Sequence, residues 1–544
     1  MADGIVRPRM AQMLEPVGAR PGASLPALLR RCPAWVLTAL LAVVWLIVDP
    51  PTPDLAAHQY RADVFRTAHA LIWEQGWYAG HHLPGYSVLV PPIASVITPQ
   101  ALAALCVAIA AWCFERLAQG HWTGNAARAA TLWFAIGVTS TLLGGQLAFA
   151  AGLAPGLAAL LVARSGPRWA ALALGALTTL TSPIAAAFLV YGCAAWWLGT
   201  RDTRAAWPAV GAVVPGVLIA VAFPQGGVQP FGTVAALISL AVALLVLPIL
   251  PRGERLVRWG AGLYGALIVG AMLIDTPVGG NLVRLAAVFG GPVVAGALWG
   301  RRALALALLA PVLFAWQWSA PVRSIARDAH DPARHEAYHA PLIAELDRRA
   351  AVEGPFRLEI PFTRTHWETR WVALRHPLAR GWERQLDVKE NDLFYEGVLT
   401  PQRYRDWLDT LAVHYVAVPD TVPDPAGRAE TRLVTAGAVP GLREVWHDRH
   451  WRLYAVAGAR PLVAPPLRVS ALGADTVTLT TPRPARGLLR VRFSPYLKLT
   501  RGRGCLSRGP GGWTLVRLDR PGSATIEPGF ALGRIHATAP RCAG

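Results

Sequence analysis

The stretch AWVLTALLAVVWLIVDPPTPDLAAHQYRADVF, residues 34–65, decides the fold class of this chain. Its first half is an uninterrupted apolar run of the kind that crosses a membrane as a helix. Its second half brings three aspartates and a histidine directly after that run. The sequence therefore predicts a membrane span with polar chemistry at its mouth.

The composition of the whole chain supports this interpretation. The 544 residues are 53% hydrophobic and only 16% charged, which is too apolar for an ordinary soluble enzyme and indicates an integral membrane protein of several domains, with the lipid bilayer as a partner. The net charge of +19 comes almost entirely from arginine, since Lys389 and Lys498 are the only lysines. Without a compact basic and aromatic motif, this charge does not indicate a nucleic-acid partner.

Apolar segments separated by short polar breaks continue to about residue 320 and predict about 11 transmembrane helices. The segments are 33–48, 86–118, 129–143, 146–163, 169–181, 183–198, 207–223, 231–250, 259–274, 282–300 and 303–319. Pro91, Pro92 and Pro99 predict a broken or re-entrant start of the second segment, and Pro183 either kinks one long helix or separates two.

The arginines predict the orientation, because short cytoplasmic loops hold the positive charge of membrane proteins. Arginines occupy the N-terminal tail and then every second loop, whereas the turns LLGGQ, LTSP, FPQGGVQP and DTPVGGN contain neither Lys nor Arg. We therefore expect a multi-pass cell-membrane protein with a cytoplasmic N-terminus and an extracytoplasmic C-terminal region. We expect the first span to be an uncleaved membrane anchor and not a signal peptide.

Four regions follow from these patterns. Residues 1–32 form a cytoplasmic tail, and 33–320 form the α-helical polytopic domain with a first outer loop at 49–85. Residues 321–460 alternate helical and strand-like patterns and predict an extracytoplasmic α/β domain, and 461–544 contain short alternating segments typical of a β-sandwich.

The cysteines agree with an oxidising outer side. Cys505 and Cys542 are the only two in the outer region, and we expect them to form a disulfide.

Candidate catalytic residues lie in the first outer loop. If residues 54–71 form a helix, Asp54, His58 and Arg61 share one face. Asp54 would act as general base toward an acceptor hydroxyl, with His58 as the second catalytic candidate and Arg61 in substrate binding. The alternatives are that Asp54 only caps the helix after Pro53 and that His58 is an ordinary interfacial histidine.

A second candidate is Arg284, in DTPVGGNLVRL. It lies about one turn inside the outer end of a span, where an ionisable group is costly and indicates a functional site. We expect Arg284 to bind a lipid-linked phosphate, with Asp275 close enough to pair with it. Snorkelling of the side chain to the headgroups is the structural alternative.

The stretch WEQGWYAGHHLPGYSVLVPP supplies aromatic residues and further polar ones. Its tryptophans and tyrosines suit an interfacial aromatic belt. The same region would also suit a sugar-binding rim, for which the candidates are Glu74, His81, His82 and Tyr86. Adjacent histidines diverge on regular elements, so a two-histidine metal site is weakly supported. The sequence identifies no cofactor and leaves a divalent metal open.

The predicted layout resembles the GT-C superfamily of membrane glycosyltransferases: an inside N-terminus, a first outer loop that opens on an aspartate, about ten further spans and an outer C-terminal region. Several stretches resemble, more closely, actinobacterial multispanning membrane proteins with a GT-C-like layout. They are TPDLAAHQYRADVF, WYAGHHLPGYSVLVPP, GGNLVRL, HWETRWVALRHPLARGWERQLD and YRDWLDTLAVHYVAV. The resemblance implies a GT-C-like fold, a polyprenyl-phosphate sugar donor and a catalytic acidic residue at the position of Asp54. The chain departs from the family pattern of two adjacent acids, because Leu55 follows Asp54.

We therefore expect a glycosyltransferase that moves a sugar from a polyprenyl-phosphate donor to a cell-envelope glycan or protein on the outer face. A transporter, a flippase or a non-catalytic envelope assembly protein is the alternative. In the outer domain, HWETRW and GWERQLD supply either a buried polar network or an acceptor-binding site. The residues concerned are His366, Glu368, Glu383, Arg384 and Asp387.

Overall fold

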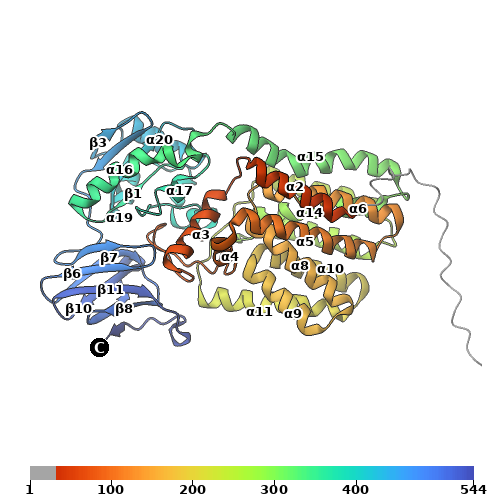
Figure 1. The fold of residues 1–544 in the computed structure, drawn as a ribbon, viewed down its shortest axis with the longest axis horizontal. Helices are drawn as coiled ribbons and strands as arrows, with labels where there is room; N and C mark the ends of the chain where they lie inside the picture. The colour runs from red at the N-terminus through yellow and green to blue at the C-terminus, as the bar shows by residue number, and fades with distance from the viewer. Residues whose placement is uncertain (1–31, 544) are drawn as a thin grey trace, which may run out of the picture.

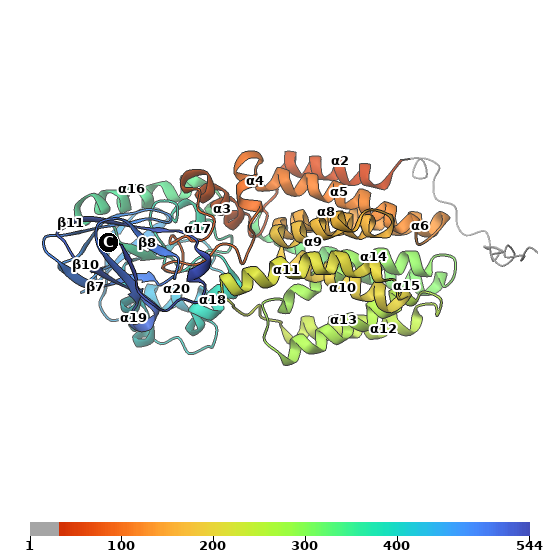
Figure 2. The same ribbon diagram turned by 90° about the horizontal axis from the view of Figure 1, so that it is seen from below.

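The computed structural model describes residues 32–543. An all-helical region lies at one end of the molecule and a β-rich region at the other, with α3 (Leu55–Ala68) and α4 (Val90–Ile97) between them (Figures 1 and 2). Apart from Cys32, the predicted cytoplasmic tail 1–32 and its arginines lie outside the described residues.

Eleven further helices and one single-turn helix, α7, build the helical region, because an apolar chain without water must satisfy its backbone hydrogen bonds internally. They are α2 (Ala34–Val48), α5 (Pro99–Gln119), α6 (Gly124–Gly137), α7 (Ser140–Leu143), α8 (Leu147–Ser165), α9 (Arg168–Thr181), α10 (Pro183–Thr200), α11 (Ala206–Ala222), α12 (Thr233–Ile249), α13 (Arg255–Leu273), α14 (Leu282–Leu298) and α15 (Ala303–Asp328).

Eight helical stretches of the described chain are long and apolar enough to cross a membrane. They are Pro99–Gln119, Gly124–Leu143, Leu147–Ser165, Pro183–Thr200, Thr203–Ala222, Arg255–Leu273, Gly279–Leu298 and Ala303–Asp328. The helices α2 and α12 are apolar but shorter, and α9 has 14 residues. The count of 11 spans therefore stays a prediction.

Two predicted segments differ from the observed helices. The segment 86–118 is divided into α4 and α5 at Thr98, whose φ of 75° interrupts the helix and whose hydroxyl caps α5 by accepting from Ala101 N. Pro183 separates α9 from α10, because Ser182 between them is extended. The last helix of the region, α15, runs to Asp328 and not to residue 319.

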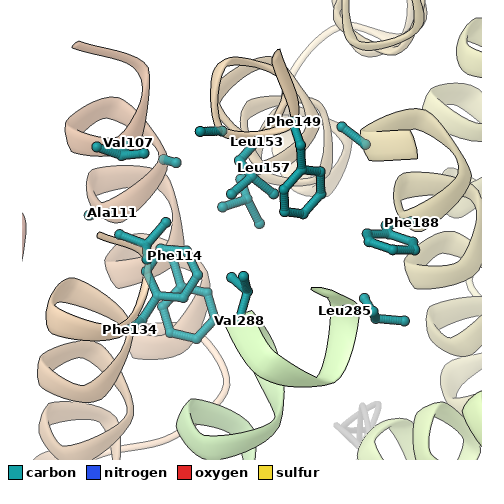
Figure 3. Close-up of a cluster of buried hydrophobic side chains, with 14 of the residues drawn as sticks. Val107, Ala111, Phe114, Phe134, Phe149, Leu153, Leu157, Phe188, Leu285 and Val288 are labelled. Carbon is teal, nitrogen blue, oxygen red and sulfur yellow. The ribbon is translucent and has the colours of Figure 1, made fainter. Parts of the chain in front are cut away.

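The helices are held together by a shared apolar core, shown in Figure 3. Phe114 of α5 stacks on Phe134 of α6 with ring centroids 4.1 Å apart, and Phe149 of α8 meets Phe188 of α10 edge-on. Leu285 of α14 belongs to the same buried cluster. This packing fixes the position of α14 and therefore of Arg284, which precedes Leu285 on that helix.

The β-rich region begins with a sheet covered by helices. The strands are β1 (Arg357–Glu359), β2 (Val413–Pro419), β3 (Leu442–His447) and β4 (Trp451–Val456), in the order β1-β2-β4-β3, with β1 parallel to β2 and the other pairs antiparallel. The accompanying helices are α16 (Glu336–Glu353), α17 (Glu368–Trp371), α18 (Arg384–Glu390), α19 (Pro401–Thr410) and α20 (Arg428–Thr435).

Two antiparallel four-stranded sheets complete the chain, in the orders β5-β6-β11-β8 and β12-β9-β10-β7. Their strands are β5 (Arg468–Leu472), β6 (Val477–Thr481), β7 (Ala485–Arg492), β8 (Leu497–Arg501), β9 (Gly504–Arg508), β10 (Trp513–Leu518), β11 (Gly522–Pro528) and β12 (Arg541–Ala543). Alternate residues of both sheets share one apolar cluster, so the sheets form a sandwich. A disulfide joins Cys505 of β9 to Cys542 of β12.

The loop between α3 and α4 fastens the two regions together. Gln75 hydrogen-bonds to the β5–β6 turn, the Trp77 indole donates to Thr369 O at 2.9 Å, and His82 Nε2 lies 2.9 Å from Ser494 Oγ. The same loop therefore contacts both parts of the β-rich region, directly beside the mouth of the helical region.

Candidate active site

Asp54 lies at the start of α3, but its side chain does not cap this helix. The residue has a left-handed backbone (φ 59°) and makes no side-chain cap hydrogen bond. Its Oδ1 instead accepts a hydrogen bond from Trp382 Nε1, 328 residues later in the chain, at 2.6 Å. The alternative of a capping carboxylate is therefore wrong. No other described residue is bonded to the Asp54 carboxylate, so Oδ2 is free to accept a proton.

The turn between α7 and α8 holds this part of α3 in place. A Cβ at Gly145 would lie 1.6 Å from Pro53 O, so only glycine permits the close approach. His58 Nε2 lies 3.2 Å from Gly145 O and 3.4 Å from the Tyr86 hydroxyl. The sequence stretch LLGGQ thus contributes to the site through its backbone.

His58 is neutral at neutral pH. Its side chain is only 3% exposed, and burial, with further contributions from Arg61 and Arg284, lowers its pKa to about 4 despite the opposing charge of Asp54. A neutral imidazole hydrogen-bonded to a backbone carbonyl orients its surroundings and carries no charge to offer a phosphate. The geometry therefore favours a positioning role for His58.

Arg61 connects α3 to the β-rich region. Its Nη2 donates to Glu383 Oε2 at 2.7 Å, and its guanidinium lies over the Tyr86 ring, 3.8 Å from the centroid. The charge of this buried arginine is therefore compensated within the protein. Arg61 is placed to hold the first outer loop against Glu383.

Arg284, in contrast, has no direct partner. The half-buried guanidinium forms no hydrogen bond or ion pair with any residue between 32 and 543, while its charge interacts with Asp54 and Tyr86. Asp275, the predicted partner, is exposed and forms no ion pair with Arg284 in the described structure. That predicted pairing is wrong, because Arg284 faces α3 and the loop that follows it.

Trp382, the residue that contacts Asp54, is itself tightly packed. The His366 ring stacks on it with centroids 3.4 Å apart, and the Arg384 guanidinium lies 4.7 Å from its centroid. Arg384 also pairs with Asp424 at 3.3 Å, and burial lowers the pKa of His366. These contacts fix the indole, which is half-buried.

Several predicted substrate-binding residues lie inside the protein. Glu74 is fully buried and accepts from the Tyr60 hydroxyl at 2.6 Å, and His81 lies 2.8 Å from the same carboxylate. Trp73, Trp77 and Tyr78 are at most 2% exposed. Neither an exposed sugar-binding rim nor a membrane belt fits these five residues, because they pack against the β-rich region. Tyr86 and His82 remain half-buried.

The sequence did not decide whether five outer-domain residues form a buried polar network or an acceptor-binding site, and the structure divides them into two sets. Glu368 and Asp387 are fully buried in separate polar networks: Glu368 accepts from Thr363, with its pKa raised to about 8 by burial, and Asp387 pairs with Arg380 at 2.7 Å. His366, Glu383 and Arg384 instead surround Trp382 or contact α3.

Among residues 32–543 there is no group of three or more His, Cys, Asp and Glu side chains that could hold a metal ion. Two groups of this site have atoms without a hydrogen-bond partner among the described residues: the Asp54 carboxylate, through Oδ2, and the Arg284 guanidinium.

Replacing Trp382 with Phe tests the role of its hydrogen bond. Trp382→Phe keeps a ring for His366 to stack on but removes the hydrogen bond that holds Asp54 Oδ1 in place. If this carboxylate acts as a base, we expect kcat to fall, because a catalytic group that is no longer held in position loses rate. The control is Trp371→Phe, since Trp371 Nε1 has no hydrogen-bond partner in the described structure. An unchanged kcat in Trp382→Phe, or an equal loss in both variants, would contradict the role of Trp382.

Comparison with known proteins adds a distant likeness in fold. No protein-family model and no curated protein sequence matches the chain. Among solved structures, the crystal structure of ArnT from Cupriavidus metallidurans in the apo state aligns over 78% of this chain and 98% of its own, with 14% sequence identity and a TM-score of 0.39. A likeness this distant carries no information about substrate or chemistry.

Proposed function

We propose that this chain is a membrane glycosyltransferase that transfers a sugar from a polyprenyl-phosphate donor to a cell-envelope glycan or protein on the outer face. The observation that carries the proposal is the pairing of an uncapped Asp54 carboxylate with an unpartnered Arg284 guanidinium at one mouth of the helical region. The two groups interact electrostatically without forming an ion pair of 4 Å or less, which leaves both free to contact a ligand.

In this reaction the acceptor hydroxyl attacks the anomeric carbon of the donor sugar. Asp54 removes the hydroxyl proton as the new C–O bond forms, and the bond between the sugar and the phosphate oxygen breaks with inversion. Arg284 binds the phosphate and stabilises the charge that develops on it as it leaves. Trp382 holds Asp54, while His58 and Arg61 hold the first outer loop.

An apolar cavity of about 470 Å³ supports a lipid-linked donor. It lies among α5, α8, α10, α12, α13 and α14, and Leu285 and Phe289, on the turns next to Arg284, line it. Arg284 precedes the lining residue Leu285, so a phosphate at Arg284 would place the start of its hydrocarbon tail beside this cavity.

Filling the cavity tests the use of a lipid donor. Gly290 lines the cavity and has room for a side chain, so Gly290→Leu should fold while occupying space needed by the tail. We expect the donor KM to rise about tenfold for a long-chain donor, which corresponds to the burial of roughly one leucine-sized group, and to change little for a short-chain analogue.

The control is Gly270→Leu on α13, which also adds a side chain in open space but does not line the cavity. Equal effects of the two substitutions, or equal effects on long-chain and short-chain donors, would contradict the proposed tail site.

A transporter, flippase or non-catalytic envelope assembly protein remains the second candidate. It would move or bind the lipid-linked sugar without cleaving it. Release of free polyprenyl phosphate therefore separates the two candidates.

The proposed orientation has its own test. The arginine pattern predicts that loop 224–230 and the chain after residue 330 lie outside, so single cysteines there should react with an impermeant thiol reagent on intact cells. A cysteine within 252–258 should react only after permeabilisation. The reverse labelling pattern would overturn the orientation and the side on which transfer occurs.

A further inference from the structure

The β-sandwich carries far more positive charge than the sheet domain before it. Residues 461–544 contain 13 Arg and Lys against 3 Asp and Glu, whereas residues 321–460 contain 20 of each. Over half of the net charge of +19 therefore lies in the last 84 residues. Within the region after residue 320 the imbalance is confined to this small domain, which indicates an anionic partner for it.

Three arginines, Arg501, Arg503 and Arg520, lie at the end of the sandwich that is farthest from the helical region. The Tyr496 hydroxyl donates to Ala222 O of α11 at 2.6 Å, so β8, which starts at Leu497, begins beside the helices and reaches Arg501 at its far end. The antiparallel strand β11 starts at this far end with Gly522. Figures 1 and 2 show the sandwich and the helical bundle at opposite ends of the molecule.

A small pocket lies between the two turns at this far end. It has a volume of about 160 Å³ and is lined by Gly502, Arg503, Leu518, Arg520, Pro521, Gly522, Ser523 and Ala524. Asp519 N donates to Arg503 O at 2.9 Å and holds the turns together. A Cβ at Gly502, whose φ is 89°, would lie 2.8 Å from the Ala524 Cβ, so the glycine keeps this wall of the pocket open.

Arg503 and Arg520 line the pocket, and Arg501 precedes the lining residue Gly502; all three arginines are exposed. Arg501, Arg503 and Arg520 form no side-chain hydrogen bond or ion pair with any residue between 32 and 543. In the same sandwich Arg492 pairs with Glu390 and Arg517 with Asp519. Four other exposed arginines of the sandwich also have no side-chain partner among the described residues, namely Arg468, Arg483, Arg486 and Arg508. Arg503 and Arg520 differ from these four because they line a pocket. Unpaired guanidinium groups around a pocket are suited to binding phosphate or carboxylate oxygens.

We propose that this pocket and its three arginines form a binding site for an anionic glycan of the cell envelope, which presents phosphate or carboxylate groups to Arg501, Arg503 and Arg520. The site is separate from Asp54 and Arg284. The proposal requires the outward orientation of the sandwich but no transfer activity, so its failure and that of the proposed enzyme are distinguishable.

The surroundings of the pocket favour a glycan over other polyanions. Ser523 lines the pocket and is paired across the sheet with Thr480, next to the pair Thr525 and Thr478, so hydroxyl groups border the cationic site. No aromatic residue lines the pocket, whereas proteins that bind single-stranded nucleic acid stack bases on aromatic rings. The pocket also lies at the opposite end of the sandwich from Tyr496, which contacts the end of the membrane-type helix α11.

The test measures binding of defined polymers to the full-length protein in detergent. The probes are poly(glycerol phosphate) and polygalacturonate, compared with an oligothymidylate of equal charge and with vesicles containing anionic lipid. The variant carries Arg501→Gln, Arg503→Gln and Arg520→Gln. Its control carries Arg428→Gln, Arg443→Gln and Arg449→Gln, which remove the same charge from exposed positions of the sheet domain.

We expect one or both glycan probes to bind, with salt-sensitive affinity that falls at least about tenfold in the pocket variant and little in the control variant. The preferred probe identifies the anionic group. The proposal is overturned if neither probe binds, if both variants lose affinity equally, or if the oligothymidylate or the vesicles bind as tightly as the glycans through the same arginines.

Discussion

Asp54→Asn is expected to lower turnover by at least about 100-fold, the low end for a positioned general base, while leaving the protein folded. The fold should persist because the Asp54 side chain does not cap α3, and the amide oxygen of asparagine can still accept the hydrogen bond from Trp382. What the substitution removes is the ability to take a proton. The loss should therefore appear mainly in kcat, measured with saturating donor and acceptor.

The control for this substitution is Asp49→Asn. Asp49 is an exposed aspartate that also has a left-handed backbone, at the C-terminal end of α2, and lies only five residues away. It should keep full activity. If Asp54→Asn retains activity in a transfer or complementation assay while Asp54→Ala only lowers expression, Asp54 has a structural role and the enzyme proposal loses its base.

Arg284→Gln is expected to act first on donor binding. Loss of a charged hydrogen bond to phosphate corresponds to roughly 1.5–3 kcal/mol, or about a 10-fold to 100-fold rise in the donor KM. Because the phosphate contact exists in the ground state as well as the transition state, kcat should change less than KM. Steady-state kinetics with varied donor concentration separate this signature from that of Asp54→Asn.

Arg66→Gln provides the matched control. Arg66 is an exposed arginine on α3, paired with Asp63 on the same helix, and its loss should leave the donor KM unchanged. A normal donor KM in Arg284→Gln, together with normal expression, would contradict phosphate binding and leave the side chain a snorkelling role.

Much of the layout was predictable from the sequence because it depends on local patterns. The apolar segments predicted the helices of the N-terminal region, since a long apolar run leaves few alternatives to a helix in lipid. The alternating segments after residue 461 predicted short strands, because one face of each is buried against the other sheet. The break at Thr98 followed from the prolines around it.

The site was harder to predict because its contacts span hundreds of residues. Asp54 and Trp382 are 328 residues apart. In the stretch GWERQLD the charged residues were the predicted site candidates, whereas the residue that contacts Asp54 is the tryptophan, Trp382. Glu74 and His81 looked like exposed polar groups, yet they pair with each other once the β-rich region covers the loop. Burial of that kind depends on tertiary packing, for which a polar loop sequence has no local signal.

The measurement that tests the central claim most directly is donor cleavage by the purified protein. Full-length protein is incubated with polyprenyl-phosphate sugars radiolabelled in the sugar, in the presence of an envelope extract, and with Asp54→Asn in parallel. The account predicts that the wild type moves label from at least one donor into the envelope fraction and releases polyprenyl phosphate, while Asp54→Asn does so at least about 100-fold more slowly. Intact donor in every wild-type reaction, or equal cleavage by Asp54→Asn, would contradict it.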